Sequence, residues 1–387
     1  MIFTGKQHAA KAGLDMKIGI ITHHTINNYG AFLQGWALQE KIKSLFPHDE
    51  VYMINYIIPK QNIINIGGFF RYYPGSETPV SWLNKITQPA IFSKVRKKNY
   101  NMTKPVYNAE QINALGMDVI VIGSDEVWNY LDKKSYSLIK FSAGLNAKRI
   151  VAYAPSVGKS ADVPVPAEVK EAMKGFSALS ARDASAQRLC ERVLGKTPML
   201  VCDPTFLTST PKIDNEKINR LTQKPYILFY YCNGMPREIK EKIVADAHKN
   251  GYRIIGGGEY DKLYSDMSIR LTPFEWAELF RRTEYVYTGT FHGVVFSIIN
   301  RRQFRVYASI ESRVKKISLI LDQFGIGNRD ILNDNIGQEL IDYDKVYRNI
   351  DKLRAGSEDY LFRAISGDDI KGDTFYDKEQ RGSEVLS

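Results

Sequence analysis

Residues 17–56, KIGIITHHTINNYGAFLQGWALQEKIKSLFPHDEVYMINY, contain the pattern that decides the fold. The short β-branched run from Lys17 to Thr22 predicts a buried strand, and apolar residues at helical spacing predict a helix from Ala31 to Phe46. A second strand is expected from Val51 to Tyr56. Strand, helix and strand in this order are typical of a parallel sheet with helical crossovers.

The same alternation continues along the chain and restarts after residue 225. Further strands are expected at 118–123, 149–155, 178–182, 199–202, 226–232, 252–255, 285–288 and 304–308. A chain of 387 residues exceeds the ~250–300 residues at which one core usually stops growing. We therefore predict an α/β protein with two Rossmann-like, doubly wound domains that face a central crevice.

The boundaries follow from breaks in the pattern. Residues 1–15 precede the first strand, and we expect them to be a tag or a disordered extension. The N-terminal domain covers 16–205, a Thr- and Pro-containing linker 206–225, the C-terminal domain 226–340, and a charged tail 341–387. Within the first domain, residues 57–104 lose the alternation, so we expect an irregular insertion with one helix.

Composition narrows the class of protein. The formal charge is +10, which suits an anionic substrate, an anionic membrane face or nucleic acid, although a solvated basic face is an equal alternative. Three singly spaced cysteines predict neither disulfides nor a zinc site and favour the cytoplasm.

The basic stretch at 94–104 could touch RNA or acidic lipid, but no nucleic-acid motif accompanies it, and we predict no nucleic-acid partner. Walker, HExxH, GxSxG and paired CxxC motifs are missing, and we predict no metal site and no cofactor.

The strongest candidate site is Thr288-Gly-Thr-Phe-His-Gly293, where a strand ends and a helix begins. Backbone N–H groups at a helix start attract anions, and Thr290, Phe291 and Gly293 belong to this turn. His292 could bind phosphate or move a proton. The alternative is that Thr290 only caps the helix and His292 is a satisfied, half-buried histidine.

Other candidates also follow strands, as expected where parallel strands end. Arg182 could clamp a carboxylate or phosphate, or else pair with Asp183 within its turn. Ser124 and Asp125 follow a glycine and would face the crevice, with Asp125 as a base toward a sugar hydroxyl, although an N-cap role is the alternative. Asn27, Asn28 and Tyr29 follow the first strand, where a turn with an N-cap is the alternative. The last candidates are Arg313 and Lys316, on a later helix.

Read together, these segments resemble the polysaccharide pyruvyl transferase family. The resemblance runs from Met16 to Phe324 and includes, in order, NNYG (27–30), GSDEVW (123–128), AYAPSVG (152–158), SARD (180–183), DPT (203–205) and TFHG (290–293). It implies a fold similar to two-domain GT-B glycosyltransferases, with the acceptor on the N-terminal side and the donor on the C-terminal side.

The resemblance also implies phosphoenolpyruvate as donor, held by Arg182, by the 290–293 turn with His292, and by Arg313 or Lys316. The acceptor would be a sugar of a bacterial-type surface polysaccharide, free or polyprenyl-linked, contacted by Asn27, Asn28, Tyr29, Ser124 and Asp125. His292 and Asp125 would be catalytic. The positive charge suits the inner face of a membrane.

Two other functions fit the same pattern. A glycosyltransferase using a nucleotide sugar would also have two such domains and a basic crevice. A non-catalytic scaffold in polysaccharide assembly would use the 94–104 stretch to bind membranes.

Overall fold

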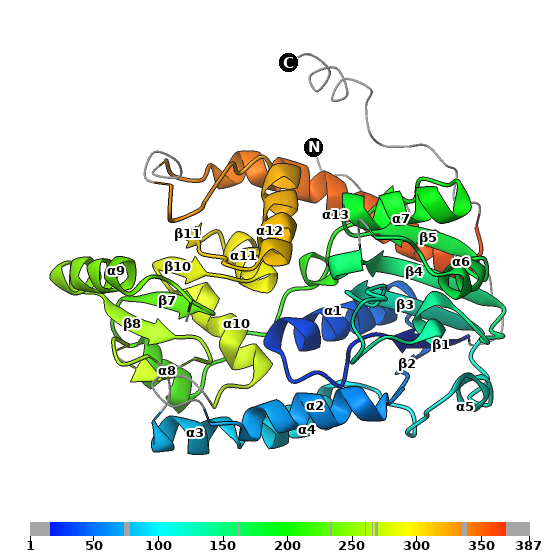
Figure 1. The fold of residues 1–387 in the computed structure, drawn as a ribbon, viewed down its shortest axis with the longest axis horizontal. Helices are drawn as coiled ribbons and strands as arrows, with labels where there is room; N and C mark the ends of the chain where they lie inside the picture. Colours follow the sequence, from blue (N-terminus) through cyan, green and yellow to red (C-terminus); the bar gives the residue numbers. More distant parts are fainter. Residues whose placement is uncertain are drawn as a thin grey trace, which may run out of the picture.

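The computed structural model describes residues 16–72, 78–160, 163–232, 234–259, 261–264, 266–267, 270–333 and 339–368. The expected N-terminal extension (1–15) and residues 369–387 of the expected tail lie outside this part of the chain. Figure 1 shows two lobes side by side, each built on its own sheet.

The first lobe contains a six-stranded parallel sheet in the order β2-β1-β3-β4-β5-β6. Its central strands are almost wholly apolar because helices cover both faces, as parallel sheets require. The strands are β1 (Lys17–Ile21), β2 (Glu50–Met53), β3 (Val119–Asp125), β4 (Arg149–Pro155), β5 (Ala178–Ala181) and β6 (Met199–Leu200).

The second lobe contains a five-stranded parallel sheet in the order β11-β10-β7-β8-β9. Its strands are β7 (Tyr226–Tyr230), β8 (Arg253–Gly256), β9 (Asp266–Met267), β10 (Tyr285–Thr288) and β11 (Gln303–Val306). In both sheets the strand order reverses near the first strand of the lobe, which is where open α/β sheets bind ligands. The predicted fold class, two doubly wound α/β domains, is confirmed.

The connecting helices begin and end where their capping residues predict. Asn28, Asp183 and Thr272 each accept a hydrogen bond from the first turn of the helix that follows, and Gly195 ends α7 in the left-handed conformation. In the first lobe these helices are α1 (Tyr29–Leu45), α5 (Ala109–Asn113), α6 (Ala167–Met173) and α7 (Ala184–Leu194). In the second they are α9 (Arg237–Lys249), α10 (Pro273–Arg282), α11 (Phe291–Ile299) and α12 (Glu311–Phe324).

Aromatic side chains join the two lobes. Tyr29 of α1 stacks on Trp276 of α10, with ring centroids 5.4 Å apart and an interplanar angle of 9°. Trp36 and Phe32 of α1 both meet Phe274 edge-on. One apolar core therefore runs through the seam between the lobes and holds α1 against α10.

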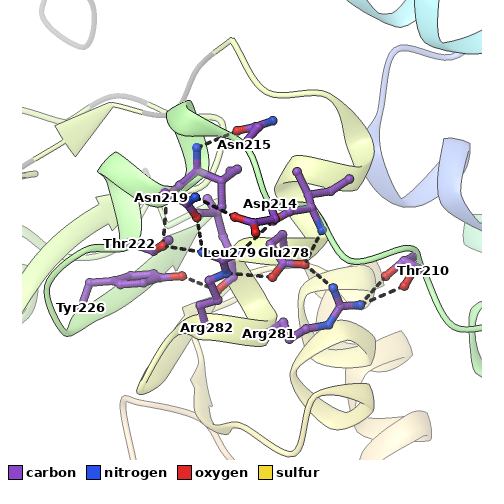
Figure 2. A network of polar contacts seen from close by, with 12 residues as sticks. Thr210, Asp214, Asn215, Asn219, Thr222, Tyr226, Glu278, Leu279, Arg281 and Arg282 are labelled. Atoms are coloured by element: carbon purple, nitrogen blue, oxygen red, sulfur yellow. Dashed lines mark hydrogen bonds and ion pairs between the residues drawn. The ribbon is translucent and has the colours of Figure 1, made fainter.

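The linker is more ordered than predicted. Residues 206–225 contain the helix α8 (Glu216–Thr222), which was not expected. Figure 2 shows how a polar network fixes this segment to α10: the buried Glu278 pairs with Arg281 and Arg282, and Arg282 also donates to Asn219 and Thr222. Glu278 thus fixes both guanidinium groups, and these hold the linker: Arg281 donates to Thr210, and Arg282 donates to the carbonyl of Ile213.

The insertion is also more regular than predicted. The described residues of this segment, 57–72 and 78–104, form three helices instead of one: α2 (Pro59–Phe70), α3 (Pro79–Lys85) and α4 (Gln88–Asn99). Each has a proline in its first two positions, where a missing N–H costs nothing. In Figure 1 the three helices lie along the lower edge of the molecule.

The prediction of a charged tail is wrong for residues 343–366. They form α13 (Tyr343–Ser366), which crosses from the second lobe back to the first (Figure 1). There the buried Tyr360 hydroxyl donates to the carbonyl of Ala152 in β4 at 2.9 Å, and the Ser357 hydroxyl accepts from the N–H of Cys202 at 2.9 Å. The helix therefore completes the packing of the first sheet. None of the helices in the described ranges combines the length and apolarity needed to span a lipid bilayer.

Candidate active site

A cavity of about 390 Å³ opens at the seam where the strands of the first sheet end. Arg182 follows β5, and Asp203 follows β6. From the second lobe come Phe291, at the start of α11, and Lys316 of α12. The complete lining is Arg182, Asp183, Ala184, Leu200, Cys202, Asp203, Phe206, Phe291, Lys316, Leu319, Ile320, Asp322, Gln323 and Phe324. Both domains therefore contribute, as the predicted central crevice requires.

Arg182 is buried and held from several sides. One terminal nitrogen lies 3.0 Å from Asp203 Oδ2, the other 3.6 Å from Asp125 Oδ1, and the guanidinium lies 4.5 Å from the centroid of Phe291. Burial alone would lower the pKa of Arg182, but Asp125 and Asp203 outweigh it and raise that pKa. The sequence alternative, a pair with Asp183, is not what forms, because Asp183 caps α7 instead.

His292 belongs to the other lobe and faces the same carboxylate. Its Nε2 is 3.9 Å from Asp203 Oδ2, and its ring packs against the backbone of α1 at Gly30. Burial lowers the pKa of His292, more than the charges of Asp203 and Asp125 raise it. The imidazole is therefore neutral at neutral pH in the absence of a ligand.

Two buried nitrogen atoms at this point have no hydrogen-bond partner within the described chain: Arg182 Nε and His292 Nε2. A buried polar group without a partner costs about 1–3 kcal/mol. Arg182 and His292 come from different lobes, and the side chains of both lie beside Asp203. The arrangement is therefore suited to a ligand that supplies acceptor atoms to both.

Asp125 lies at the end of β3, beside Arg182. Its φ of 77° is uncommon for a residue other than glycine. Burial would raise the pKa of Asp125, but the positive charge of Arg182 holds it below its usual value. Asp125 is therefore an ionised hydrogen-bond acceptor near neutral pH.

Lys316 and Arg313, the two basic candidates, occupy different places. Lys316 lines the cavity and forms an ion pair with Glu126. Arg313 lies over the ring of Tyr231, 4.5 Å from its centroid, and does not line the cavity. The structure therefore favours Lys316.

The 290–293 turn has the predicted strand-to-helix form. Thr290 is the N-cap of α11, and its hydroxyl oxygen accepts from the N–H of Gly293 at 3.1 Å. Any side chain at Gly293 would meet the hydroxyl of Thr288 at 1.9 Å, so the tight turn requires glycine. The capping role of Thr290 was the sequence alternative, and it is present here.

The side chains expected to bind the acceptor have structural partners instead. Asn28 caps α1, and Asn27 accepts from Arg96 at 2.9 Å. The Tyr29 hydroxyl accepts from Gln88 at 2.8 Å inside the seam. Ser124 is buried and donates to the carbonyl of Ala154 at 2.8 Å. The prediction that Ser124 faces the crevice is therefore wrong, and Tyr29, expected to contact the acceptor, is buried in the seam.

A family model for polysaccharide pyruvyl transferases matches residues 28–310, more than half of the chain. The chain belongs to this family. The match spans the lobes and contains Arg182, Asp203 and His292, the three residues that meet at the seam. No relative was found among curated proteins.

Solved structures resemble the chain only at low identity. A UDP-N-acetylglucosamine 2-epimerase has 10% identity and a TM-score of 0.48, with 92% of this chain and 97% of the other covered. The epimerase from Methanocaldococcus jannaschii has 12% identity and a TM-score of 0.43, with 91% and 100% covered. The glycosyltransferase SnogD from Streptomyces nogalater has 11% identity and a TM-score of 0.43, with 91% and 98% covered.

Three residues of this pyruvyl transferase family member were given no role from the sequence, although Asp203 belongs to the DPT segment (203–205) that helped to carry the resemblance. Asp203 follows a strand, and the rule that selected Arg182 could have selected it too. Lys140 and His23 form a second buried pair near Asp125, with Lys140 Nζ 3.3 Å from His23 Nδ1. Burial lowers the pKa of Lys140 to about 7 and that of His23 to about 3. Lys140 lies in the short 3-10 helix Leu138–Phe141 and does not follow a strand of the sheet, so the rule of strand ends could not select it.

A second cavity, of about 430 Å³, adjoins the first and shares Asp183, Lys316 and Leu319 with it. Its remaining lining is largely polar: Ser156, Gly158, Lys159, Ser185, Ile310, Glu311 and Lys315. Hydroxyl, ammonium and carboxylate groups in one cavity can hydrogen-bond a polyhydroxylated molecule.

Proposed function

We propose that this family member transfers the pyruvyl group of phosphoenolpyruvate to a sugar of a surface polysaccharide or of its lipid-linked precursor. Two hydroxyls of the sugar would become a cyclic pyruvate ketal, and phosphate would be released. Phosphoenolpyruvate is a substrate here, and the proposal requires no cofactor.

One observation carries the donor assignment: Arg182 Nε and His292 Nε2 are buried and lack partners among the described residues, and both side chains lie beside Asp203. Phosphoenolpyruvate has a carboxylate and a phosphate, so it can supply acceptors to both lobes. Arg182 has five N–H donors, and Asp203 takes only one at hydrogen-bonding distance. Lys316 adds a third donor on the cavity wall.

The chemistry requires a proton at the methylene carbon. Donor binding brings negative charge beside His292, which raises the pKa of its imidazole and lets it take up a proton. The imidazolium gives this proton to the methylene carbon, C2 becomes electrophilic, and the oxygen of the first sugar hydroxyl bonds to C2. The C2–O bond to phosphate then breaks with its electron pair, and the second hydroxyl closes the ketal.

The protons of the two hydroxyls balance this sequence. Asp125 would accept a hydrogen bond from the first sugar hydroxyl and orient it. The proton of that hydroxyl would pass to the imidazole of His292 and replace the one given to the methylene carbon. The second proton leaves with phosphate. The lowered pKa of Asp125 makes it a weak base, so we assign its contribution mainly to orientation.

We place the acceptor sugar in the second cavity. It shares Lys316 with the donor cavity, so both substrates would contact one ammonium group. The hydroxyls of Ser156 and Ser185, with Lys159 and Lys315, would hold the sugar. These residues replace Ser124 and Tyr29 as the expected contacts.

Thermal unfolding with added ligands tests the donor. Phosphoenolpyruvate at about 100 times its dissociation constant should stabilise the protein by ~2.7 kcal/mol. Stabilisation by UDP or GDP, with none by phosphoenolpyruvate, would instead identify a nucleotide-sugar glycosyltransferase.

Two substitutions test the residues. His292→Ala and Arg182→Ala should each leave a folded protein and lower transfer by a factor on the order of 10²–10⁴. Mass spectrometry of sugar acceptors incubated with phosphoenolpyruvate would detect the ketal, and released phosphate would give the rate. Near-normal turnover in either variant would remove that residue from the proposal. Arg313→Ala, outside the cavity lining, is the matched control.

A further inference from the structure

The helices α2 and α3 present an apolar face that is exposed. Ile63 and Phe70 of α2 are 72% and 54% exposed, and Val80 and Leu83 of α3 are 60% and 53% exposed. Ile64, Ile66 and Tyr72 are also exposed, and the two helices contact each other. Single exposed apolar residues are ordinary, but a cluster of this kind on adjacent helices marks a binding surface.

This apolar face lies in the most basic segment of the chain. Residues 57–104 contain eight basic residues and one acidic residue, a formal charge of +7 out of +10 for the whole protein. Within α2 only Lys60 is charged. Lys94, Lys97 and Lys98 lie exposed on α4, which contacts α2. Exposed apolar and exposed basic side chains thus lie on helices that contact one another.

We propose that α2, α3 and the lysines of α4 dock the protein on an anionic lipid bilayer. The apolar side chains would enter the boundary between head groups and acyl chains, and the lysines would contact anionic head groups. A second copy of the chain is disfavoured as the occupant, because it would bring two segments of charge +7 together. In the sequence, contact of residues 94–104 with acidic lipid was one of the alternatives considered; the structure adds the apolar face of α2 and α3.

The docking helices are fixed to the domain they would orient. Asn65 of α2 accepts from the N–H of Asn27 and donates to the carbonyl of Thr25, and Arg96 of α4 donates to Asn27. This loop leads directly into α1, where Gly30 contacts His292. A protein docked in this way would meet a lipid-linked acceptor at the bilayer surface, a consequence that rests on the proposed function.

Flotation of the full chain with vesicles tests the surface. The protein should bind vesicles of phosphatidylcholine with phosphatidylglycerol and not vesicles of phosphatidylcholine alone, and salt should weaken the binding. Each lysine near an anionic surface contributes about 5-fold in affinity, so three charge reversals should weaken binding at least ~100-fold. Each apolar side chain removed should weaken it roughly 10-fold. The charge variant is Lys94→Glu/Lys97→Glu/Lys98→Glu, and the apolar variant is Ile63→Ser/Phe70→Ser/Val80→Ser.

Matched controls lie in the second lobe. Lys242→Glu/Lys249→Glu/Lys262→Glu removes the same charge from exposed positions, and Leu332→Ser removes an exposed apolar side chain. Both controls should bind like the wild type. Trp82 of α3, whose Nε1 donates to the carbonyl of Phe70 at 3.1 Å, supplies a direct reporter, since its emission should shift to the blue on binding.

The possible results separate clearly. No binding of the wild type to anionic vesicles, or equal loss in the controls, would overturn the proposal. Binding lost only in the charge variant would overturn the insertion of α2 and α3. A dimer in solution that the apolar variant dissociates, or binding only to an acidic protein, would assign the surface to that partner. Stabilisation by phosphoenolpyruvate should persist in every variant, so failure here is distinct from failure of the proposed donor site.

Discussion

Gly30 of the first lobe lies against the imidazole of His292 in the second lobe, and its lack of a side chain leaves room for that ring. A Cβ at this residue would lie 2.1 Å from His292 Cγ and 2.2 Å from its Nδ1. Non-bonded carbon atoms are at their optimum about 3.5–4.0 Å apart. Gly30→Ala must therefore move the imidazole or α1 by more than ~1 Å. Position 30 is the second residue of α1, where alanine itself is favourable.

The size of the effect follows from this displacement. A misplacement of about 1 Å at a reacting group can cost on the order of 10² in rate, so transfer by Gly30→Ala should fall about 100-fold. Overpacking at the seam should lower the free energy of unfolding by ~1–3 kcal/mol. The fold itself should persist, because one tight contact is small beside the apolar core that joins the lobes.

Phosphate release from phosphoenolpyruvate, with the acceptor identified by mass spectrometry, measures the loss. His292→Ala removes the two ring atoms nearest the new methyl group and leaves only the Cβ of residue 292, 2.6 Å from it. In that background Gly30→Ala should lower rate and stability much less than in the wild type, so the two substitutions should be strongly non-additive. Full activity of Gly30→Ala, or an equal additional loss in the His292→Ala background, would refute the placement of the imidazole.

Three further measurements test other parts of the structure. We expect His292 to be neutral in the free protein and protonated beside the donor, so binding of phosphoenolpyruvate should take up a proton, and its affinity should fall as pH rises. Calorimetry should show less proton uptake for His292→Gln. Lys140, with a pKa of about 7, is neutral in the folded protein and charged in the unfolded chain between pH 7 and 10. The free energy of unfolding should therefore increase with pH in this range by up to ~1.4 kcal/mol per pH unit because of Lys140. Urea unfolding of Lys140→Met at several pH values should lack this contribution. Tyr360→Phe should lower the free energy of unfolding by about 1 kcal/mol through its lost hydrogen bond to Ala152, and an unchanged value would argue against docking of α13 on β4.

Local sequence pattern predicted most strands and helices well. The strands at 149–155 and 285–288 match the expected ranges, because buried parallel strands are short apolar runs whose ends are set by polar residues. Only one helix was expected in the insertion, although Pro59, Pro79 and Pro89 marked the starts of α2, α3 and α4. Their apolar residues face outward or contact another helix, so they do not follow the usual pattern of one buried face.

The helix α13 was missed for a different reason. Its charges suggested a solvated tail, yet Ile350, Tyr360, Leu361 and Ile365 are buried at helical spacing. That spacing was readable in the sequence. The surface that buries them belongs to β4 and to the segment after β6, more than 150 residues earlier in the chain, and only folding brings it there.

Local pattern was enough to predict two sheets, the succession of strands along the chain and the candidates that follow strand ends, because hydrophobic period and turn chemistry act over a few neighbouring residues. The order of the strands within each sheet and the meeting of the candidates depend on the folded chain. Arg182 and His292 converge on Asp203, Lys316 lines the cavity while Arg313 does not, and Tyr29 and Ser124 are packed inside. These outcomes depend on how α1 and α10 pack across the seam, a contact between residues about 240 positions apart that no local pattern encodes.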